Sequence, residues 1–288
     1  MNPSIASFLQ MLFNGLSLGA TLALIAVGLT MVFGVLHVVN FAHGVLFMFG
    51  AYTTYFVVEV LEQSYFAALV AATVTVAAIS AALAATVFRR FQGLLLEGAI
   101  AGILLALLLE NLALVWFGAS PKNVAGPFTT VVALGGVYLE AQRILIIAIA
   151  VVLVTALHLF VTRTRHGRAL RATQQDPFAA RLQGIAVRRV MIMTFAIGGA
   201  LAGAAGALVA PQQVLLPSMG QPPLLLAFVI VIVAGMGSVK GSLIVAVAIG
   251  LLQSAISTYW VPEAAVWSSF AVALCFLALR PRGVFGNA

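Results

Sequence analysis

The hydrophobic residues of this chain fall into nine apolar segments separated by short polar stretches. A helix needs about 20 mostly apolar residues to cross a bilayer, so each segment is a candidate transmembrane helix. Val45–Val60 and Leu224–Met236 are short for a full crossing, and we expect short or broken helices there. The nine segments are Phe8–Phe33, Val45–Val60, Phe66–Phe88, Leu94–Phe117, Ile144–Val161, Val190–Ala210, Leu224–Met236, Leu243–Trp260 and Ala264–Leu279.

This pattern predicts an all-α integral membrane protein, a single domain over residues 1–288 with eight or nine transmembrane helices. Composition agrees, because 63% of the residues are hydrophobic, only 7% are charged and the mean hydropathy is +1.17. A soluble domain carries roughly a quarter charged residues. The pI near 10.3 comes from basic residues between apolar segments. Membrane topology explains them better than a polyanion does, so we expect no nucleic-acid partner.

Positive charge predicts the orientation of the chain, because Lys and Arg are retained in cytoplasmic loops. With nine crossings and an external N-terminus, twelve of the fourteen Lys and Arg lie in the cytoplasm, and Lys122 and Arg143 lie outside. If Leu224–Trp260 were one crossing, Lys240 would be buried in the bilayer at a cost of about 2.5–3.5 kcal/mol. We therefore expect an external N-terminus, a cytoplasmic C-terminus and an external loop at residues 118–142 that could form a docking surface.

The longest polar interruption is Thr162–Arg189, which holds seven of the fourteen Lys and Arg. We expect this loop to be cytoplasmic. It carries the signals of a short helix, because Asp176 can cap the first N–H groups, Pro177 suits the first helical position and Gly184 can end the helix in the left-handed conformation. The sequence thus predicts a two-turn helix at residues 177–183, available to a cytoplasmic partner.

A second polar interruption, Gly34–Gly44, lies in the first apolar half of the chain. Its His37, Asn40 and His43 are spaced three apart and would share one face of a helix. Polar groups at membrane depth are tolerated when they are buried in protein or line a wet cavity. Two interpretations stay open. One is a broken helix whose Asn40 and His43 line a translocation pathway, and the other is an ordinary connection with polar residues at a helix interface.

Glu110 and Asn111 place polar groups within the apolar segment Leu94–Phe117. A carboxylate there must face the interior of the bundle or water. Glu110 either touches a transported substrate, with Asn111 beside it on the pathway, or holds a neighbour such as Arg143 or the Asn111 amide.

Small residues recur at the spacing that lets helices approach closely in lipid. Gly15–Gly19, Gly98–Gly102 and Gly199–Gly203 each read GxxxG, and Gly206 continues the last of them. Close packing, without a role in gating, is the simpler interpretation of each.

The sequence gives little support to catalysis. A catalytic metal site needs about three protein ligands, and no spacing of the histidines supplies them. Ser17 and Ser80, with His43 as a base, are not distinguished by any motif. Gly235–Ser242 is not a phosphate-binding loop, because that motif, GxxxxGK[ST], needs Lys directly after its second glycine, and here Lys240 precedes Gly241. We expect no enzyme activity, no metal and no cofactor or ATP bound by this chain.

Four stretches in order carry a family likeness. They read NGLSLGATLALIAVGLTMVFGVLHVVNFAHGVLFMFGAY at Asn14–Tyr52, GRALRATQQDPFAARLQGIAVRRVMIMTFAIGGALAGAAGALVAP at Gly167–Pro211, AFVIVIVAGMGSVKGSLIVAVAIGLLQS at Ala227–Ser254, and RPRGVFG near the C-terminus. Together they resemble the branched-chain amino-acid ABC-transporter permease family.

The resemblance implies an ABC importer permease fold in the bacterial inner membrane. It also implies half of a pathway for branched-chain or related amino acids, shared with a second permease. Two cytoplasmic ATP-binding subunits that use ATP, and an external solute-binding protein, would complete the system. By position, the resemblance places a coupling element on Arg171–Ile185, with ATPase-coupling residues at Arg171, Asp176, Pro177, Ala180, Arg181 and Gly184.

The chain departs from the family pattern at Val45 and Gln253, where polar or acidic residues are frequent. A urea or short-amide substrate is therefore also considered. A different class of function is a stand-alone secondary transporter or channel for a small polar solute. The apolar segments contain no pair of acids that would support ion coupling.

Overall fold

The computed structural model describes residues 3–36, 38, 40–128, 130–134, 137–280 and 283–285. Within these residues the chain forms eleven α-helices, three short helical turns and one two-stranded sheet. The helices are α1 (Pro3–Leu36), α2 (His43–Tyr55), α3 (Tyr65–Thr86), α4 (Leu95–Phe117), α5 (Ala141–Arg163), α6 (Arg165–Gln175), α7 (Pro177–Leu182), α8 (Val187–Val209), α9 (Gln221–Ala234), α10 (Val239–Tyr259) and α11 (Ala264–Leu279). The turns are the π-helical η1 (Phe56–Val60) and the 3-10 turns η2 (Phe88–Arg90) and η3 (Ala210–Gln212), and the strands are β1 (Val131–Leu134) and β2 (Val137–Glu140).

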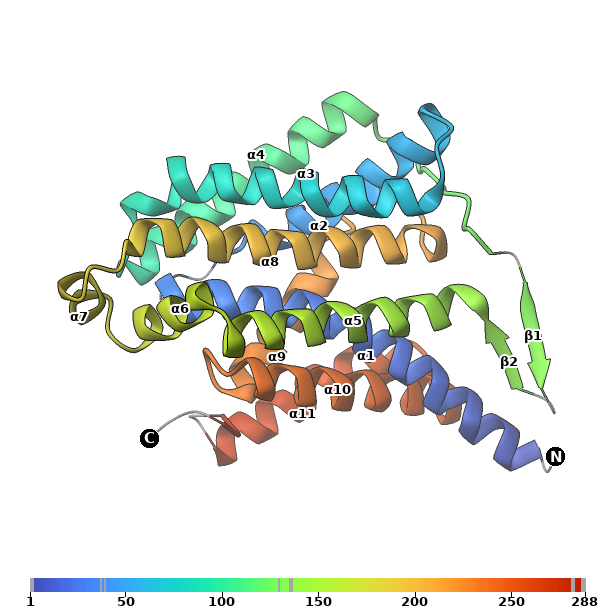
Figure 1. The fold of residues 1–288 in the computed structure, drawn as a ribbon. Coiled ribbons are helices and arrows are strands. Elements are labelled where there is room, and N and C mark those ends of the chain that lie inside the picture. The colour runs from blue at the N-terminus through green and yellow to red at the C-terminus, as the bar shows by residue number, and fades with distance from the viewer. Residues whose placement is uncertain are drawn as a thin grey trace.

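Each of the nine predicted apolar segments forms a helix, namely α1 to α5 and α8 to α11. Among the described residues, six of these helices are long and apolar enough to cross a membrane: α1, α3, α4, α5, α8 and α10. Helices α9 and α11 are apolar but shorter, and α2 is prolonged by η1. The long helices run side by side in a bundle (Figure 1). The chain is therefore a helical, multi-pass membrane protein.

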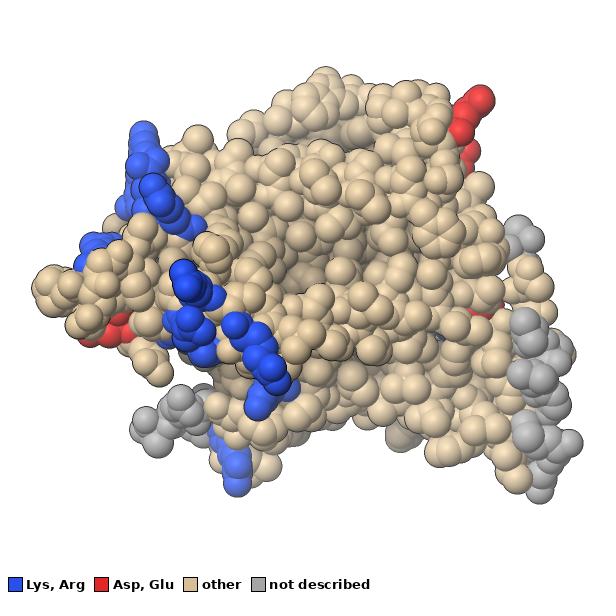
Figure 2. Space-filling model, viewed as in Figure 1, with Lys and Arg blue, Asp and Glu red and all other residues tan. Residues whose placement is uncertain are grey.

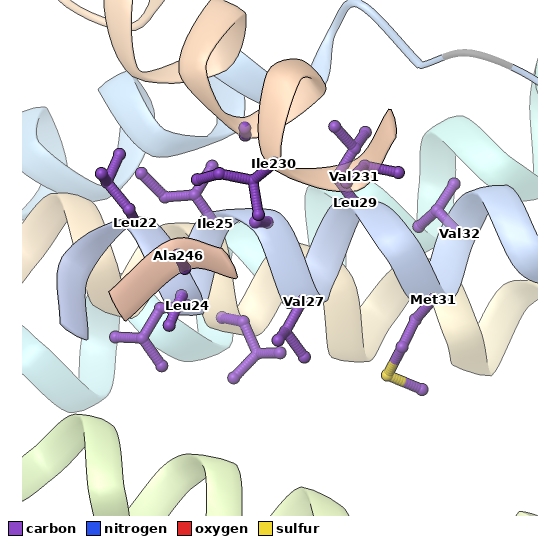
Figure 3. Packing of buried hydrophobic residues seen from close by; sticks show 14 of the residues in the cluster. Leu22, Leu24, Ile25, Val27, Leu29, Met31, Val32, Ile230, Val231 and Ala246 are labelled. Atoms are coloured by element: carbon purple, nitrogen blue, oxygen red, sulfur yellow. The ribbon is translucent and has the colours of Figure 1, made fainter. Parts of the chain in front are cut away.

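Helix α1 forms the core of the bundle and packs against α5, α8, α9 and α10. In its apolar spanning stretch 89% of the residues are buried. Side chains such as Leu24, Ile25 and Met31 point from α1 toward its neighbours (Figure 3) and are fully buried. A membrane helix buried to this extent is shielded from lipid on nearly every side.

The GxxxG pair on α1 explains how α10 packs so closely against it. A Cβ added to Gly15 or Gly19 would lie 2.9 Å from the Cα atoms of Leu251 or Val247 on α10. Only a residue without a side chain leaves room for that approach. The predicted packing role of this motif is confirmed.

The polar interruption after α1 reverses the direction of the chain. Helix α1 ends at Leu36, and α2 begins at His43, whose Nε2 lies 3.2 Å from the carbonyl oxygen of Ile25. Helix α2 therefore starts partway along α1 and not at its end. His37 and Val39 lie outside the described residues.

Helices α2 and α9 begin beside each other. Gly44 in the first turn of α2 contacts Gly220, which directly precedes α9. A Cβ on either glycine would overlap the carbonyl oxygen of the other. Two short helices thus meet at their N-terminal ends inside the bundle, which is the kind of broken-helix geometry that membrane transporters use.

The loop at residues 118–142 corrects the expectation of a purely helical chain. Strands β1 and β2 pair as an antiparallel hairpin, with Val131 opposite Glu140. The Gln10 side chain of α1 pairs with the Tyr138 backbone like a neighbouring strand, donating to its oxygen at 3.0 Å and accepting from its nitrogen at 2.8 Å. Lys122 forms an isolated bridge with Leu215, which joins the same loop to the connection before α9.

The two ends of the bundle differ in charge (Figure 2). Lys and Arg gather at the end where α6 and α7 lie, here called the basic end. The hairpin and the N-terminus lie at the opposite end, here called the hairpin end (Figure 1). The cationic residues of the described basic end are Arg89, Arg90, Arg163, Arg165, Arg168, Arg171, Arg181, Arg188, Arg189, Lys240 and Arg280.

Candidate functional site

A cavity of about 790 Å³ opens at the hairpin end of the bundle. Its walls come from α1, the start of α5, the end of α8, the start of α9, the end of α10 and the start of α11. We call it the hairpin-end cavity. Its polar lining residues are Asn14, Ser17, Thr21, Arg143, Gln212, Gln213, Ser218, Gln253, Ser254, Ser257 and Thr258.

The polar residues of the cavity are mostly hydroxyls and amides whose positions are fixed by hydrogen bonds. Gln253 donates to Ser269 Oγ at 2.9 Å, and Ser254 donates to the carbonyl oxygen of Met11 at 2.7 Å. Thr21 donates to the Ser17 carbonyl at 3.2 Å. Apart from Arg143, such a lining offers both donors and acceptors without formal charge, which suits a small polar solute.

Arg143 lies on the wall of this cavity at the first turn of α5. Its Nε donates to Glu140 Oε2 at 2.8 Å, and its Nη1 donates to Asn14 Oδ1 at 2.9 Å. One alternative predicted from the sequence was that Glu110 holds Arg143. That alternative is wrong, because Arg143 pairs with Glu140, three residues before it.

Asn40 and His43 are both buried at the break between α1 and α2. Asn40 Oδ1 accepts from the Ala42 backbone N–H at 3.1 Å and so shapes the turn. His43 makes its contact with the Ile25 carbonyl on α1. Neither residue is among those that line the described cavities. Their place on a translocation pathway stays a prediction.

Glu110 lies in a separate pocket of about 230 Å³ between α4, α9 and the start of α2. Its carboxylate accepts from Gln221 Nε2 at 3.0 Å and 3.2 Å, so it holds the first residue of α9 and not Arg143 or Asn111. Asn111 is exposed, and its amide donates to the Leu107 carbonyl on its own helix at 2.7 Å. Glu110 therefore lines this pocket and Asn111 does not. A pathway role for either residue stays a prediction.

Helix α7 at the basic end has the geometry that the sequence predicts. Asp176 Oδ1 accepts from the backbone N–H groups of Phe178 at 2.8 Å and Ala179 at 3.0 Å, and Pro177 is the first helical residue. Gly184 follows with φ +78°, the left-handed conformation that favours glycine. The helix ends at Leu182, one residue before the predicted end.

One face of α7 is free and the other is packed. Phe178 and Leu182 are 69% and 73% exposed, whereas Ala180 is 4% exposed. Large apolar side chains this exposed, outside the spanning helices, are typical of a contact site for another protein. Arg171 does not belong to that face, because its guanidinium donates to the Val161 carbonyl at the end of α5.

A cavity of about 410 Å³ separates α7 from the turn that joins α3 to α4. Gln92 of that turn connects the two sides. Arg181 Nη2 donates to Gln92 Oε1 at 3.3 Å, and Gln92 Nε2 lies 2.8 Å from the sulfur of Met191 on α8. The short helix is therefore linked both to α8 and to the α3–α4 turn.

The residues weighed for catalysis do not form a catalytic site. Ser80 donates to the Phe195 carbonyl at 2.6 Å, His43 contacts Ile25, and Ser17 lines the hairpin-end cavity. In the described part of the chain no three His, Cys, Asp or Glu residues gather to hold a metal. Gly235–Ser238 forms a tight turn, with Gly235 and Gly237 at positive φ, and Val239–Ser242 is already the start of α10.

The cavity residues that the sequence analysis missed do share a pattern. On α1, Asn14, Ser17 and Thr21 are spaced three and four apart, and on α10 the polar residues follow the face of Gln253 and Ser257. Helical spacing of this kind places uncharged polar groups on one face. Searching each apolar segment for such faces, and not only for charges, would have found them.

A multi-helix membrane bundle with a polar cavity at one end and an exposed capped helix at the other defines an integral membrane transport protein. Residues 11–279 match the family described as "Branched-chain amino acid transport system / permease component". The chain belongs to this family, and it is a transport permease and not an enzyme.

Individual relatives agree with the family match. The chain is 29% identical to the high-affinity branched-chain amino acid transport system permease protein BraD of Pseudomonas aeruginosa, over 99% of this chain and 98% of that protein. It is 30% identical to the high-affinity branched-chain amino acid transport system permease protein LivH of Escherichia coli K12, over 100% of this chain and 98% of that protein. A probable branched-chain amino acid transport permease protein LivH of Methanocaldococcus jannaschii is 33% identical over 38% of this chain. No solved structure gives a significant match.

Proposed function

We propose that this chain is the permease subunit of an ABC importer and forms half of the pathway for branched-chain or related amino acids. The observation that carries the proposal is the placement of two features at opposite ends of one bundle. A polar cavity opens at the hairpin end, and the capped helix α7 is exposed at the basic end. Substrate would enter at the first, and an ATP-driven subunit would act on the second.

The charge difference between the ends supports an orientation in a bacterial inner membrane. The basic end would face the cytoplasm and the N-terminus would lie outside. All nine apolar helices would then alternate in direction, with α2 and α9 as short helices that start inside the bilayer. Lys240 would lie at the cytoplasmic surface.

The proposed system gives this chain three kinds of partner. The relatives are permease proteins of transport systems, and an importer of this class combines two permeases, two ATP-binding subunits and an external solute-binding protein. The hairpin end would receive the solute-binding protein, and Phe178 and Leu182 of α7 would contact an ATP-binding subunit. ATP would be used by that subunit and not by this chain.

Substitutions in α7 test the coupling role. Leu182→Asp changes an exposed side chain, so the fold should persist while ATP-binding subunits are lost in co-purification and import fails. Ala180→Glu places a charge on the packed face, and Gly184→Val strains the left-handed position. Both should uncouple ATP hydrolysis from import without preventing insertion. Gln183→Ala is the matched control. Normal import by all three variants would refute the coupling assignment.

Labelling tests the orientation, and reconstitution separates the alternative function. With Cys275 replaced by Ala, a single cysteine at Phe178 should react with a membrane-impermeant maleimide only after cells are opened. Labelling in intact cells would show that the topology is the reverse of the one proposed.

A stand-alone secondary transporter would take up leucine in proteoliposomes containing this chain alone and an ion gradient. An ABC permease needs its ATP-binding subunits and ATP.

A further inference from the structure

Among the described residues that line the hairpin-end cavity, Arg143 is the sole charged side chain. Its ion-pair partner Glu140 does not line the cavity, and the two side chains are 31% and 47% exposed. The cation thus faces the cavity while its counter-charge lies outside the wall. An entering solute meets a positive group against a neutral, hydroxyl-rich surface.

The guanidinium is oriented before any solute arrives. Glu140 and Asn14 accept from two of its five N–H groups. Asn14 in turn accepts from Gln10 Nε2 at 3.1 Å, and Gln10 is held by both backbone groups of Tyr138. In the part of the chain that the structure describes, the other three N–H groups have no acceptor. A planar fork with free donors matches the geometry of a carboxylate.

The rest of the cavity complements the remainder of an amino acid. Hydroxyl and amide oxygens on α1 and α10 can accept from an ammonium group. Leu22, Phe47 and Leu226 add apolar surface to the same wall. We propose that Arg143 is the residue that binds the carboxylate of the substrate at the cavity, with Asn14 and Glu140 as positioning residues. This inference rests on the proposed amino-acid import.

Competition binding to the assembled complex of permease and ATP-binding subunits, without solute-binding protein, tests the carboxylate contact. Radiolabelled L-leucine is displaced by unlabelled L-leucine or by L-leucinamide, which lacks the carboxylate. The wild-type complex should prefer leucine by at least about tenfold, the size of one charge-assisted contact. Arg143→Gln should weaken leucine binding to the level of leucinamide and leave leucinamide unchanged. Arg143→Lys should retain part of the preference.

Lys122→Gln is the matched control, because Lys122 is the other described cation of the hairpin end and lies over the Tyr55 ring, outside the cavity. If Arg143 had only a structural role, Arg143→Gln would weaken the binding of both ligands equally. The ratio of leucine affinity to leucinamide affinity therefore distinguishes a structural role from carboxylate binding. An unchanged ratio in Arg143→Gln, or import of leucine without any measurable preference in the wild type, would overturn the inference alone. Failure of the wild-type system to import leucine would instead refute the proposed function.

Discussion

Helices α8 and α4 are both apolar and both long enough to cross a membrane, yet the structure uses them in opposite ways. Of the spanning stretch around α8, 72% is buried inside the bundle, whereas only 11% of the stretch in α4 is buried. Helix α8 packs against α1, α2 and α3, and α4 runs along the outer side of the bundle (Figure 1). The buried helix is the slightly less apolar of the two.

The difference follows from side-chain size. Gly199 and Gly203 of α8 lie against the α3 backbone, and Gly206 lies against α2. Helix α4 instead presents leucines outward, such as Leu104 and Leu108, which are 62% and 56% exposed. In lipid no hydrophobic force draws two apolar helices together, so close contact decides which helix is central. Hydropathy identifies a crossing helix, and small residues determine where it packs.

The largest effect expected from this comparison is that of Gly206→Leu on α8. A Cβ there would overlap the Phe47 carbonyl oxygen, and neither backbone can move aside. Overpacking of a core typically costs about 1–3 kcal/mol, and a clash with backbone lies at or above that range. We expect little monodisperse protein in size-exclusion chromatography of detergent extracts. Recovery equal to the wild type would contradict the account of α8.

Glu110→Leu tests the contact that a carboxylate of the peripheral helix α4 makes with α9. The substitution removes the acceptor of Gln221 and leaves the start of α9 without its link to α4. A loss of about 1 kcal/mol in the free energy of unfolding is expected for a partly exposed hydrogen bond. Glu110→Gln, which keeps an acceptor, is the control. Thermal unfolding gives the stability, and loss of import by both variants at unchanged stability would assign Glu110 to the pathway.

Ser80→Ala should have a smaller effect. Ser80 joins α3 to α8 by a bond to the Phe195 carbonyl, and hydrogen bonds between membrane helices contribute on average about 0.6 kcal/mol. Thr86→Ala is the matched control, because Thr86 donates within its own helix to Ala82. The two variants should differ by only a degree or two in unfolding midpoint, and a loss of assembly in Ser80→Ala would show that the polar contact outweighs the glycine packing.

Leu104→Ala on α4 should be nearly silent. The side chain is largely exposed, so its truncation leaves no cavity and should change stability by less than about 0.5 kcal/mol. An unfolding midpoint clearly below the wild type, or loss of complex assembly, would show that α4 is covered by a partner subunit and not by lipid.

The sequence was sufficient for the helices and for the capped helix α7, because both depend on local signals. All nine apolar segments form helices, and Asp176, Pro177 and Gly184 have the expected roles in capping. The hairpin was missed because its strands are only four residues each, and one of them is held by Gln10, which is 128 residues away from Tyr138 in the chain. Local patterns do not report such distant contacts.

The polar faces on single helices could be found from their spacing, but their assembly into one cavity could not, because its residues are dispersed over the chain. Single hydroxyls such as Ser17, Thr21 and Ser254 barely interrupt an apolar segment, and they meet only when α1 packs against α10. Glu110 was predicted instead because it is a charged residue within an apolar segment. Its carboxylate accepts hydrogen bonds from Gln221. The partner of Arg143 was only three residues away, but its side-chain direction depends on the turn from β2 into α5.

The contact between Gly44 and Gly220 joins the first turn of α2 to the residue directly before α9. Because each glycine lies against the carbonyl oxygen of the other, a side chain at either position would force the starts of α2 and α9 apart. The Lys122–Leu215 bridge joins the connection before α9 to the loop at the hairpin end, and α9 leads directly to the turn before α10. The loop at the hairpin end is therefore connected to the turn at the basic end through one short helix.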